Sequence, residues 1–170
     1  MKKALILIAS TLIGFQLPQI ITLKEYYDGK GVLFDKEYKY PFIESDYKEP
    51  FTPTLKQIKQ AEDLLFSDYY EYRTKVLDNF KSNYKLNTKL KEPKKVKNKF
   101  FKYYRQYAGY TNNSNDSIIY IGLFNFSNKK KASEYFEGWD KTLSLGSGEY
   151  YQDNQEFYLM NLTQKKIVFK

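Results

Sequence analysis

The fold is decided by the stretch at residues 52–80, which reads TPTLKQIKQAEDLLFSDYYEYRTKVLDNF. Its apolar residues recur at spacings of three and four, which places them on one face of a helix. Thr52 can cap this helix through its hydroxyl, and Pro53 suits the first helical position, where a missing N–H costs nothing. The pattern therefore predicts one long amphipathic helix ending near Phe80. Its apolar face consists of Leu55, Ile58, Ala61, Leu65, Tyr69, Tyr72, Val76 and Phe80.

The C-terminal third is rich in β-branched and aromatic residues, which predicts strands. Residues 107–110 and 117–126 are expected to form an antiparallel hairpin around a polar turn, and residues 155–162 and 166–169 give two further strand candidates. A long helix followed by about four antiparallel strands predicts an α+β domain whose sheet packs one face on the helix. The specific expectation is a cystatin-like or related roll.

Packing expectations follow from this arrangement. Pro93 precedes a second, shorter helical pattern over residues 94–104, with Val96, Phe100 and Tyr104 on one side. Trp139 is the only tryptophan and is expected to pack on the sheet. The long helix should bury four side chains against that sheet: Leu55, Ile58, Leu65 and Val76.

The N-terminus has the pattern of an export segment. Two lysines precede an uncharged, mostly apolar run at residues 4–15, as in the n-region and h-region of a secretory signal. No A-x-A triplet follows, and the uncharged stretch 4–23 is long enough for an uncleaved anchor. A buried N-terminal strand or helix is the remaining interpretation. Three parts are expected: a signal peptide or anchor at 1–23, an extended aromatic-rich arm at 24–50, and the α+β domain at 51–170.

The chain of 170 residues contains neither cysteine nor histidine. Disulfides, thiolate zinc sites, and Ser-His-Asp or Cys-His nucleophile systems are therefore excluded. Only carboxylates, lysines, tyrosines and hydroxyls remain for chemistry, which weakens the case for an enzyme. No catalytic residue, cofactor or metal site is assigned from the sequence.

Positive charge is concentrated between Lys81 and Arg105, where nine lysines and one arginine stand against the single Glu92. Clustered lysines attract phosphate, sulfate or uronate groups, and interleaved aromatic rings can stack on a bound partner. The alternatives are a merely solvated face and, for Arg105, pairing with a local carboxylate. The predicted anion-binding residues are Lys94, Lys95, Lys97, Lys99, Lys102 and Arg105, with aromatic contacts from Phe101, Tyr103 and Trp139.

The leading functional interpretation is an exported, non-enzymatic binding domain located in the periplasm, at the cell surface or outside the cell. Its expected partner is an anionic glycan, a lipid head group or an envelope protein; nucleic acid is not expected as the physiological partner of an exported protein. One alternative is a small hydrolase of cell-surface polymers, in which Trp139 would hold a sugar beside Glu137, Asp140 and Glu149. The other is a structural envelope protein.

Three stretches carry a resemblance to known proteins. They are Phe51-Thr52-Pro53-Thr54 with Gln60-Ala61-Glu62, the strand Tyr104 to Tyr110, and the closing segment from Gly146-Ser147-Gly148 to Thr163. Together they resemble a group of small secreted bacterial proteins without assigned function, over roughly residues 51–163. The chain departs from that group where Gly146-Ser147-Gly148-Glu149 replaces a Gly-Gly-Asn-Cys stretch. The resemblance implies export and a single domain, and it implies no activity.

Overall fold

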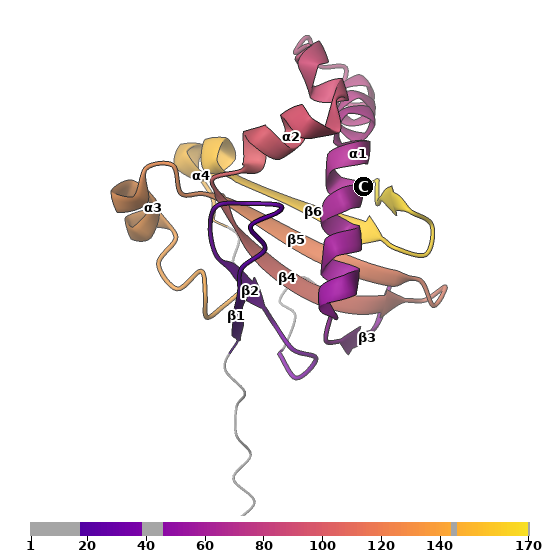
Figure 1. Ribbon diagram of the computed structural model, residues 1–170. Coiled ribbons are helices and arrows are strands. Elements are labelled where there is room, and N and C mark those ends of the chain that lie inside the picture. The colour runs from indigo at the N-terminus through magenta and orange to yellow at the C-terminus, as the bar shows by residue number, and fades with distance from the viewer. Residues whose placement is uncertain (1–17, 39–45, 144–145, 170) are drawn as a thin grey trace, which may run out of the picture.

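The structure is a computed structural model that describes residues 18–38, 46–143 and 146–169. One long helix lies across a seven-stranded, mostly antiparallel open sheet (Figure 1). The strand order is β1-β2-β4-β5-β6-β7, and β3 also pairs with β4. The predicted α+β class is confirmed, although the sheet has more than the four strands expected. The strands are β1 Gln19–Ile21, β2 Gly31–Leu33, β3 Tyr47–Phe51, β4 Tyr103–Asn112, β5 Ser117–Asn125, β6 Gln155–Asn161 and β7 Lys166–Ile167.

The long helix α1 spans Leu55–Asn79, close to the predicted range, but its cap was assigned wrongly. Thr54, not Thr52, is the capping residue: its hydroxyl accepts from the Gln57 amide at 3.3 Å, and Gln57 Oε1 accepts from the Thr54 amide at 2.9 Å. This reciprocal capping box satisfies amides that the first turn leaves free. The Thr52 hydroxyl instead accepts from the Lys36 amide. The other helices are the 3-10 helix η1 Thr88–Lys91, then α2 Pro93–Phe100, α3 Lys129–Tyr135 and α4 Glu149–Asn154.

The predicted apolar face of α1 is buried only in its middle part, from Ile58 to Tyr69. Ile58 and Leu65 are fully buried, as expected. Leu55, at the first helical position, is 53% exposed, and Val76 is half-buried, so the prediction was wrong for these two. For Val76 the reason is visible in Figure 1, where the C-terminal end of α1 extends past the edge of the sheet. Leu55 lies at the opposite end, in the first turn of the helix.

The hairpin of β4 and β5 forms the centre of the sheet, as predicted. Its register runs from Tyr103 opposite Asn125 to Thr111 opposite Ser117. Because side chains alternate along a strand, Tyr107 joins the core beneath α1 whereas Ala108 joins a second core on the other face. Both faces of the central strands are therefore covered.

The arm at 24–50 contributes strands that the sequence did not indicate. β2 runs parallel to β4, with Gly31 opposite Arg105, and β3 runs antiparallel to the next part of β4, with Phe51 opposite Gly109. Gly109 lies so close to Phe51 that an added Cβ would meet its ring at 2.7 Å. The arm is thus joined to the sheet through the same edge of β4.

The predicted export segment at 1–23 is described only from residue 18. Residues 1–17, which contain its charged start and apolar run, lie outside the described residues. Beyond them, β1 pairs antiparallel with β2, and Ile21 and Leu23 are buried in the core under α1. Within the described ranges, no helix has both the length and the apolar character needed to cross a bilayer.

Trp139 packs on the sheet, as expected. Its ring contacts Tyr104 of β4 at 5.1 Å and Phe126 at 5.7 Å between centroids. Gln106, also on β4, donates from Nε2 to the carbonyl oxygens of Trp139 and of Thr142, the latter at 2.8 Å. These contacts fasten the segment after α3 to the face opposite α1.

Candidate anion-binding surface

The basic segment, residues 81–105, leaves the end of α1, passes through η1 and α2, and enters β4. Much of it lies on the part of the molecule that projects beyond the sheet (Figure 1). Lys99 and Arg105 have ion-pair partners, whereas its other lysines have none among the described residues. Uncompensated positive charge on one part of a molecule produces a potential that attracts anions.

Helix α2 displays lysines because its apolar residues turn inward. Pro93 occupies its first turn, and Val96 and Phe100, four residues apart, are fully buried. The predicted short helix is confirmed, but it stops at Phe100 because the following residues enter β4. Lys94 and Lys95 are exposed and Lys97 is half-exposed. With the exposed Lys102 just after the helix, these residues form what we call the basic surface: Lys94, Lys95, Lys97 and Lys102.

Arg105 does not belong to that surface. Its side chain is fully buried under α1, where Nε donates to Glu62 Oε1 at 2.9 Å. Its Nη1 donates to the carbonyl oxygens of Tyr103 at 2.7 Å and Phe100 at 3.2 Å, and Nη2 is buried with no hydrogen-bond partner among the described residues. Pairing with a carboxylate was the alternative considered for Arg105, and the alternation of β4 explains it: position 105 faces the helix.

Lys99 is compensated as well. Its ammonium donates to Glu156 at 2.6 Å and to the Tyr69 hydroxyl at 2.5 Å, and it lies 4.2 Å from the centre of the Phe100 ring. Burial lowers the pKa of Lys99, an effect that the neighbouring Glu156 opposes. With 31% of its side chain exposed and its charge paired, Lys99 is a weaker candidate for an anion than the four lysines of the basic surface.

A groove of about 520 Å³ borders the basic surface. Tyr26 and Phe66 stack in it with ring centroids 6.1 Å apart, and the Lys97 ammonium lies 5.7 Å from the centre of the Tyr26 ring. Burial and the adjacent Asp63 carboxylate raise the pKa of Tyr26 to about 12, so its hydroxyl stays protonated at neutral pH. The sequence analysis missed Tyr26, because only the fold brings the arm beside α2. The groove is lined by Tyr26, Asp63, Phe66, Pro93, Lys94, Lys97 and Asn98.

The three predicted aromatic contacts differ in accessibility. Phe101 is 36% exposed and lies next to Lys102 at the end of α2. Tyr103 is buried, with its ring edge-on to Phe100 at 5.2 Å, so its assignment as a contact residue was wrong. The ring of Trp139 packs against Tyr104 on the face of the sheet away from α1. Phe101 therefore remains the accessible candidate beside the basic surface.

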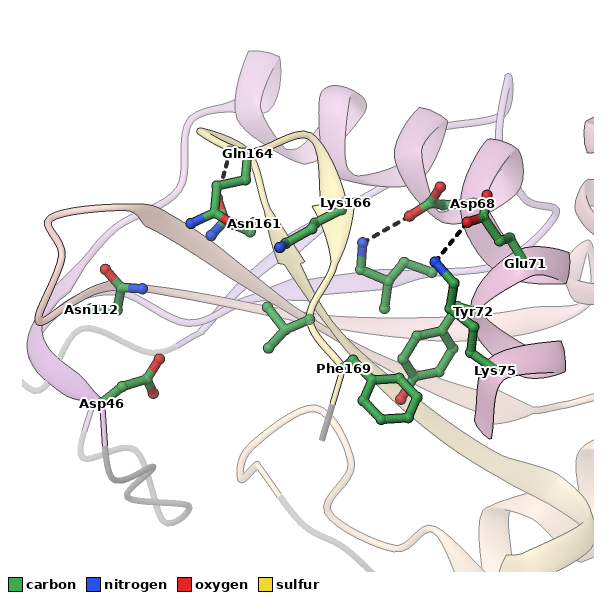
Figure 2. A pocket seen from close by; sticks show the side chains of 12 residues that line it. Asp46, Asp68, Glu71, Tyr72, Lys75, Asn112, Asn161, Gln164, Lys166 and Phe169 are labelled. Atoms are coloured by element: carbon green, nitrogen blue, oxygen red, sulfur yellow. Dashed lines mark hydrogen bonds and ion pairs between the residues drawn. The ribbon is translucent and has the colours of Figure 1, made fainter. Parts of the chain in front are cut away.

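A second groove of about 520 Å³ lies between α1 and the C-terminal strand (Figure 2). Asp68, Glu71 and Lys75 of α1 line one side, but their charges are engaged locally. Asp68 accepts from the Ile167 amide at 3.0 Å, and Glu71 pairs with Lys75 at 2.6 Å. Among the described residues, no three acidic groups gather in a manner suited to a metal ion. This groove mixes both signs of charge and does not favour an anion.

The carboxylates considered for a hydrolase do not line one common groove among those described for residues 18–38, 46–143 and 146–169. Glu149 lines a groove of about 500 Å³ together with Asp153 and the stacked rings of Tyr135 and Tyr150, which lie 3.9 Å apart. Glu137 and Asp140 are absent from the lining of that described groove. The tryptophan expected to hold a sugar is engaged with Tyr104 instead. The predicted trio of carboxylates thus lacks a common cleft among the described grooves.

Comparisons with known proteins complete the description of the site. No protein-family model, no curated protein and no solved structure matches the chain.

Proposed function

We propose that the chain is a non-enzymatic binding protein that acts at the cell envelope after export, and that its basic surface holds an anionic partner. The observation that carries the proposal is the set of four accessible lysines, Lys94, Lys95, Lys97 and Lys102, none of which has an ion-pair partner among the described residues. Exposed lysines of this kind are free to neutralise phosphate, sulfate or carboxylate groups. The groove between Tyr26 and Lys97 adds an aromatic wall.

The resemblance to small secreted bacterial proteins and the basic, apolar start of the chain support the export part of this proposal. The long helix packed across an antiparallel sheet supports a cystatin-like roll as the finer description of the fold. In this proposal the sheet is a scaffold: it fixes α1, and α1 in turn positions α2 through buried Val96 and Phe100.

We expect substitution of all four lysines of the basic surface by glutamine to weaken binding to heparin or to phosphatidylglycerol vesicles by about tenfold or more. For the polyanion, log K decreases as log salt concentration rises. This negative slope should become shallower by about 3, because four charged contacts are lost. Binding is measured by fluorescence titration of the full chain across a salt series.

The matched control replaces four exposed lysines outside the segment by glutamine: Lys56, Lys129, Lys130 and Lys141. Both variants then carry the same net charge, so a difference between them reports position rather than charge alone. An equal loss of binding affinity in the two variants would show that the lysines of the basic surface are only solvated and form no specific site. If the unchanged protein bound neither heparin nor the vesicles, the proposed function would be refuted.

A further inference from the structure

Two aromatic side chains stand in solvent at the end of α1. Phe80 is 72% exposed and Tyr84 is 64% exposed, the highest values among the large apolar and aromatic residues of the described chain. The neighbouring apolar residues behave differently, since Leu86 and Leu90 pack against the main core. We call Phe80 and Tyr84 the aromatic tip. Both rings are exposed to solvent, although other apolar side chains between α1 and α2 face inward.

Hydrogen bonds hold the backbone that carries the tip. The Lys81 amide donates to the Asp78 carbonyl at 3.0 Å and the Ser82 amide donates to the Leu77 carbonyl at 2.9 Å, while Lys81 adopts a positive φ of 50°. This is the hydrogen-bond pattern of a Schellman turn, which closes a helix on a left-handed residue. The turn fixes the direction of Phe80, and the Tyr84 amide is held in turn by the Ser82 hydroxyl at 3.2 Å.

Exposed lysines flank the aromatic tip in the sequence. Lys81, Lys85 and Lys89 are exposed and lack an ion-pair partner among the described residues, while Asp78 is the acidic residue nearest in sequence. This end of the molecule projects beyond the sheet (Figure 1), so a flat surface can approach it without meeting the rest of the domain.

From this combination we propose that the aromatic tip enters the interface of an anionic phospholipid bilayer, with Lys81, Lys85 and Lys89 against the head groups. Aromatic rings with lysines around them suit the boundary between acyl chains and charged head groups. A soluble polyanion would use the lysines and leave Phe80 in water, whereas a bilayer uses both. The inference rests on the proposed function, for which it names the anionic partner.

Flotation of the full chain with vesicles tests the inference. Phosphatidylglycerol–phosphatidylcholine vesicles should bind the protein, and Phe80→Ser with Tyr84→Ser should lower the partition coefficient by about tenfold or more. Both residues are exposed, so circular dichroism should show an intact fold. The control pair Leu55→Ser and Phe157→Ser removes two exposed apolar residues away from the tip and should change partitioning less than about twofold. All variants share the same N-terminal run, so its contribution cancels.

A second readout places the tip in the bilayer. Tryptophan introduced by Tyr84→Trp should be quenched by brominated lipids, while Trp139, which packs on the sheet, should not. Loss of heparin binding should not accompany the tip substitutions. Equal partitioning of the tip variant and the unchanged protein, or binding to heparin without binding to anionic vesicles, would overturn this inference and leave the proposed function standing. Binding to neither probe would overturn both.

Discussion

Glu62→Ala should lower the free energy of unfolding by about 3–5 kcal/mol, as expected when one partner of a buried ion pair is removed. Glu62 and Arg105 are both fully buried, and Glu62 Oε1 accepts from Arg105 Nε at 2.9 Å and from the Tyr107 hydroxyl at 2.7 Å. The guanidinium also lies 4.8 Å from the centre of the Tyr27 ring. Without Glu62, the positive charge of Arg105 stays in the core with no carboxylate beside it. Urea denaturation at neutral pH measures the change.

A double variant separates the value of the ion pair from the cost of breaking it. Glu62→Leu combined with Arg105→Met replaces both charges by apolar side chains of similar length and should recover most of the stability lost by Glu62→Ala. Tyr107→Phe removes one hydrogen bond to the carboxylate and should cost about 1.5–3 kcal/mol. A loss below about 1 kcal/mol for Glu62→Ala would contradict the geometry, because so small a value is typical of exposed ion pairs.

The ion pair illustrates what could not be predicted from the sequence. Arg105 was predicted to belong to an exposed basic segment because it ends a stretch of sequence that contains nine lysines. The side-chain alternation of β4 reverses that assignment, but only the register of β4 beneath α1 shows that the partner is Glu62, more than forty residues earlier. In α1, Glu62 follows Ala61 on the buried side of the helix. An acidic residue at such a position indicates a buried partner of opposite charge, but the sequence does not show which residue that partner is.

The elements that could be predicted are those with local signals. The periodicity of α1 and the aromatic and β-branched runs of β4, β5 and β6 are contained in contiguous stretches. The Thr54-Leu55-Lys56-Gln57 sequence also fits a capping box, but Pro53 suits the first helical position and so favoured Thr52 as the cap. Strands β1, β2 and β3 could not be found in this way, since they are three to five residues long and gain their stability from pairing with distant partners.

The candidate site was predictable in charge but not in shape. The sequence indicated the basic segment and its lysines, and Lys94, Lys95, Lys97 and Lys102 are accessible in the structure. It could not show that Lys99 meets Glu156, or that Tyr26 from the arm lies beside Lys97. These are contacts between segments about sixty or seventy residues apart, and no local pattern encodes them.

The many tyrosines of the core should make the protein sensitive to alkali. Burial raises the pKa of Tyr27 and of Tyr103 from the ordinary value of 10 to about 12. Burial also raises the pKa of Tyr107 and of Tyr158 well above the ordinary value, and a nearby carboxylate raises each of them further. In the folded protein these hydroxyls stay neutral at pH values where the unfolded chain ionises them.

The direction of the pH dependence follows from these raised values. Stability from the buried tyrosines is complete below pH 10 and is lost as the pH rises towards about 12, because the unfolded state then loses protons that the folded state keeps. Each such tyrosine removes about 1.4 kcal/mol per pH unit within this window. Lys99 acts in the opposite direction, since burial lowers its pKa, but it is one group against several. We therefore expect cooperative unfolding between pH 10 and about 12.

Variants identify the groups responsible for this transition. Tyr27→Phe and Tyr103→Phe each remove an ionisable hydroxyl from the core and should move the midpoint to higher pH, whereas Tyr84→Phe at the exposed tip should leave it in place. Circular dichroism follows the fold while tyrosinate absorbance follows ionisation in the same titration. The part of the tyrosinate signal that comes from the buried hydroxyls should change together with the fold, because these hydroxyls ionise only when the core opens. Ionisation of all eighteen tyrosines with the fold intact would show that the core admits charge or water that its burial excludes.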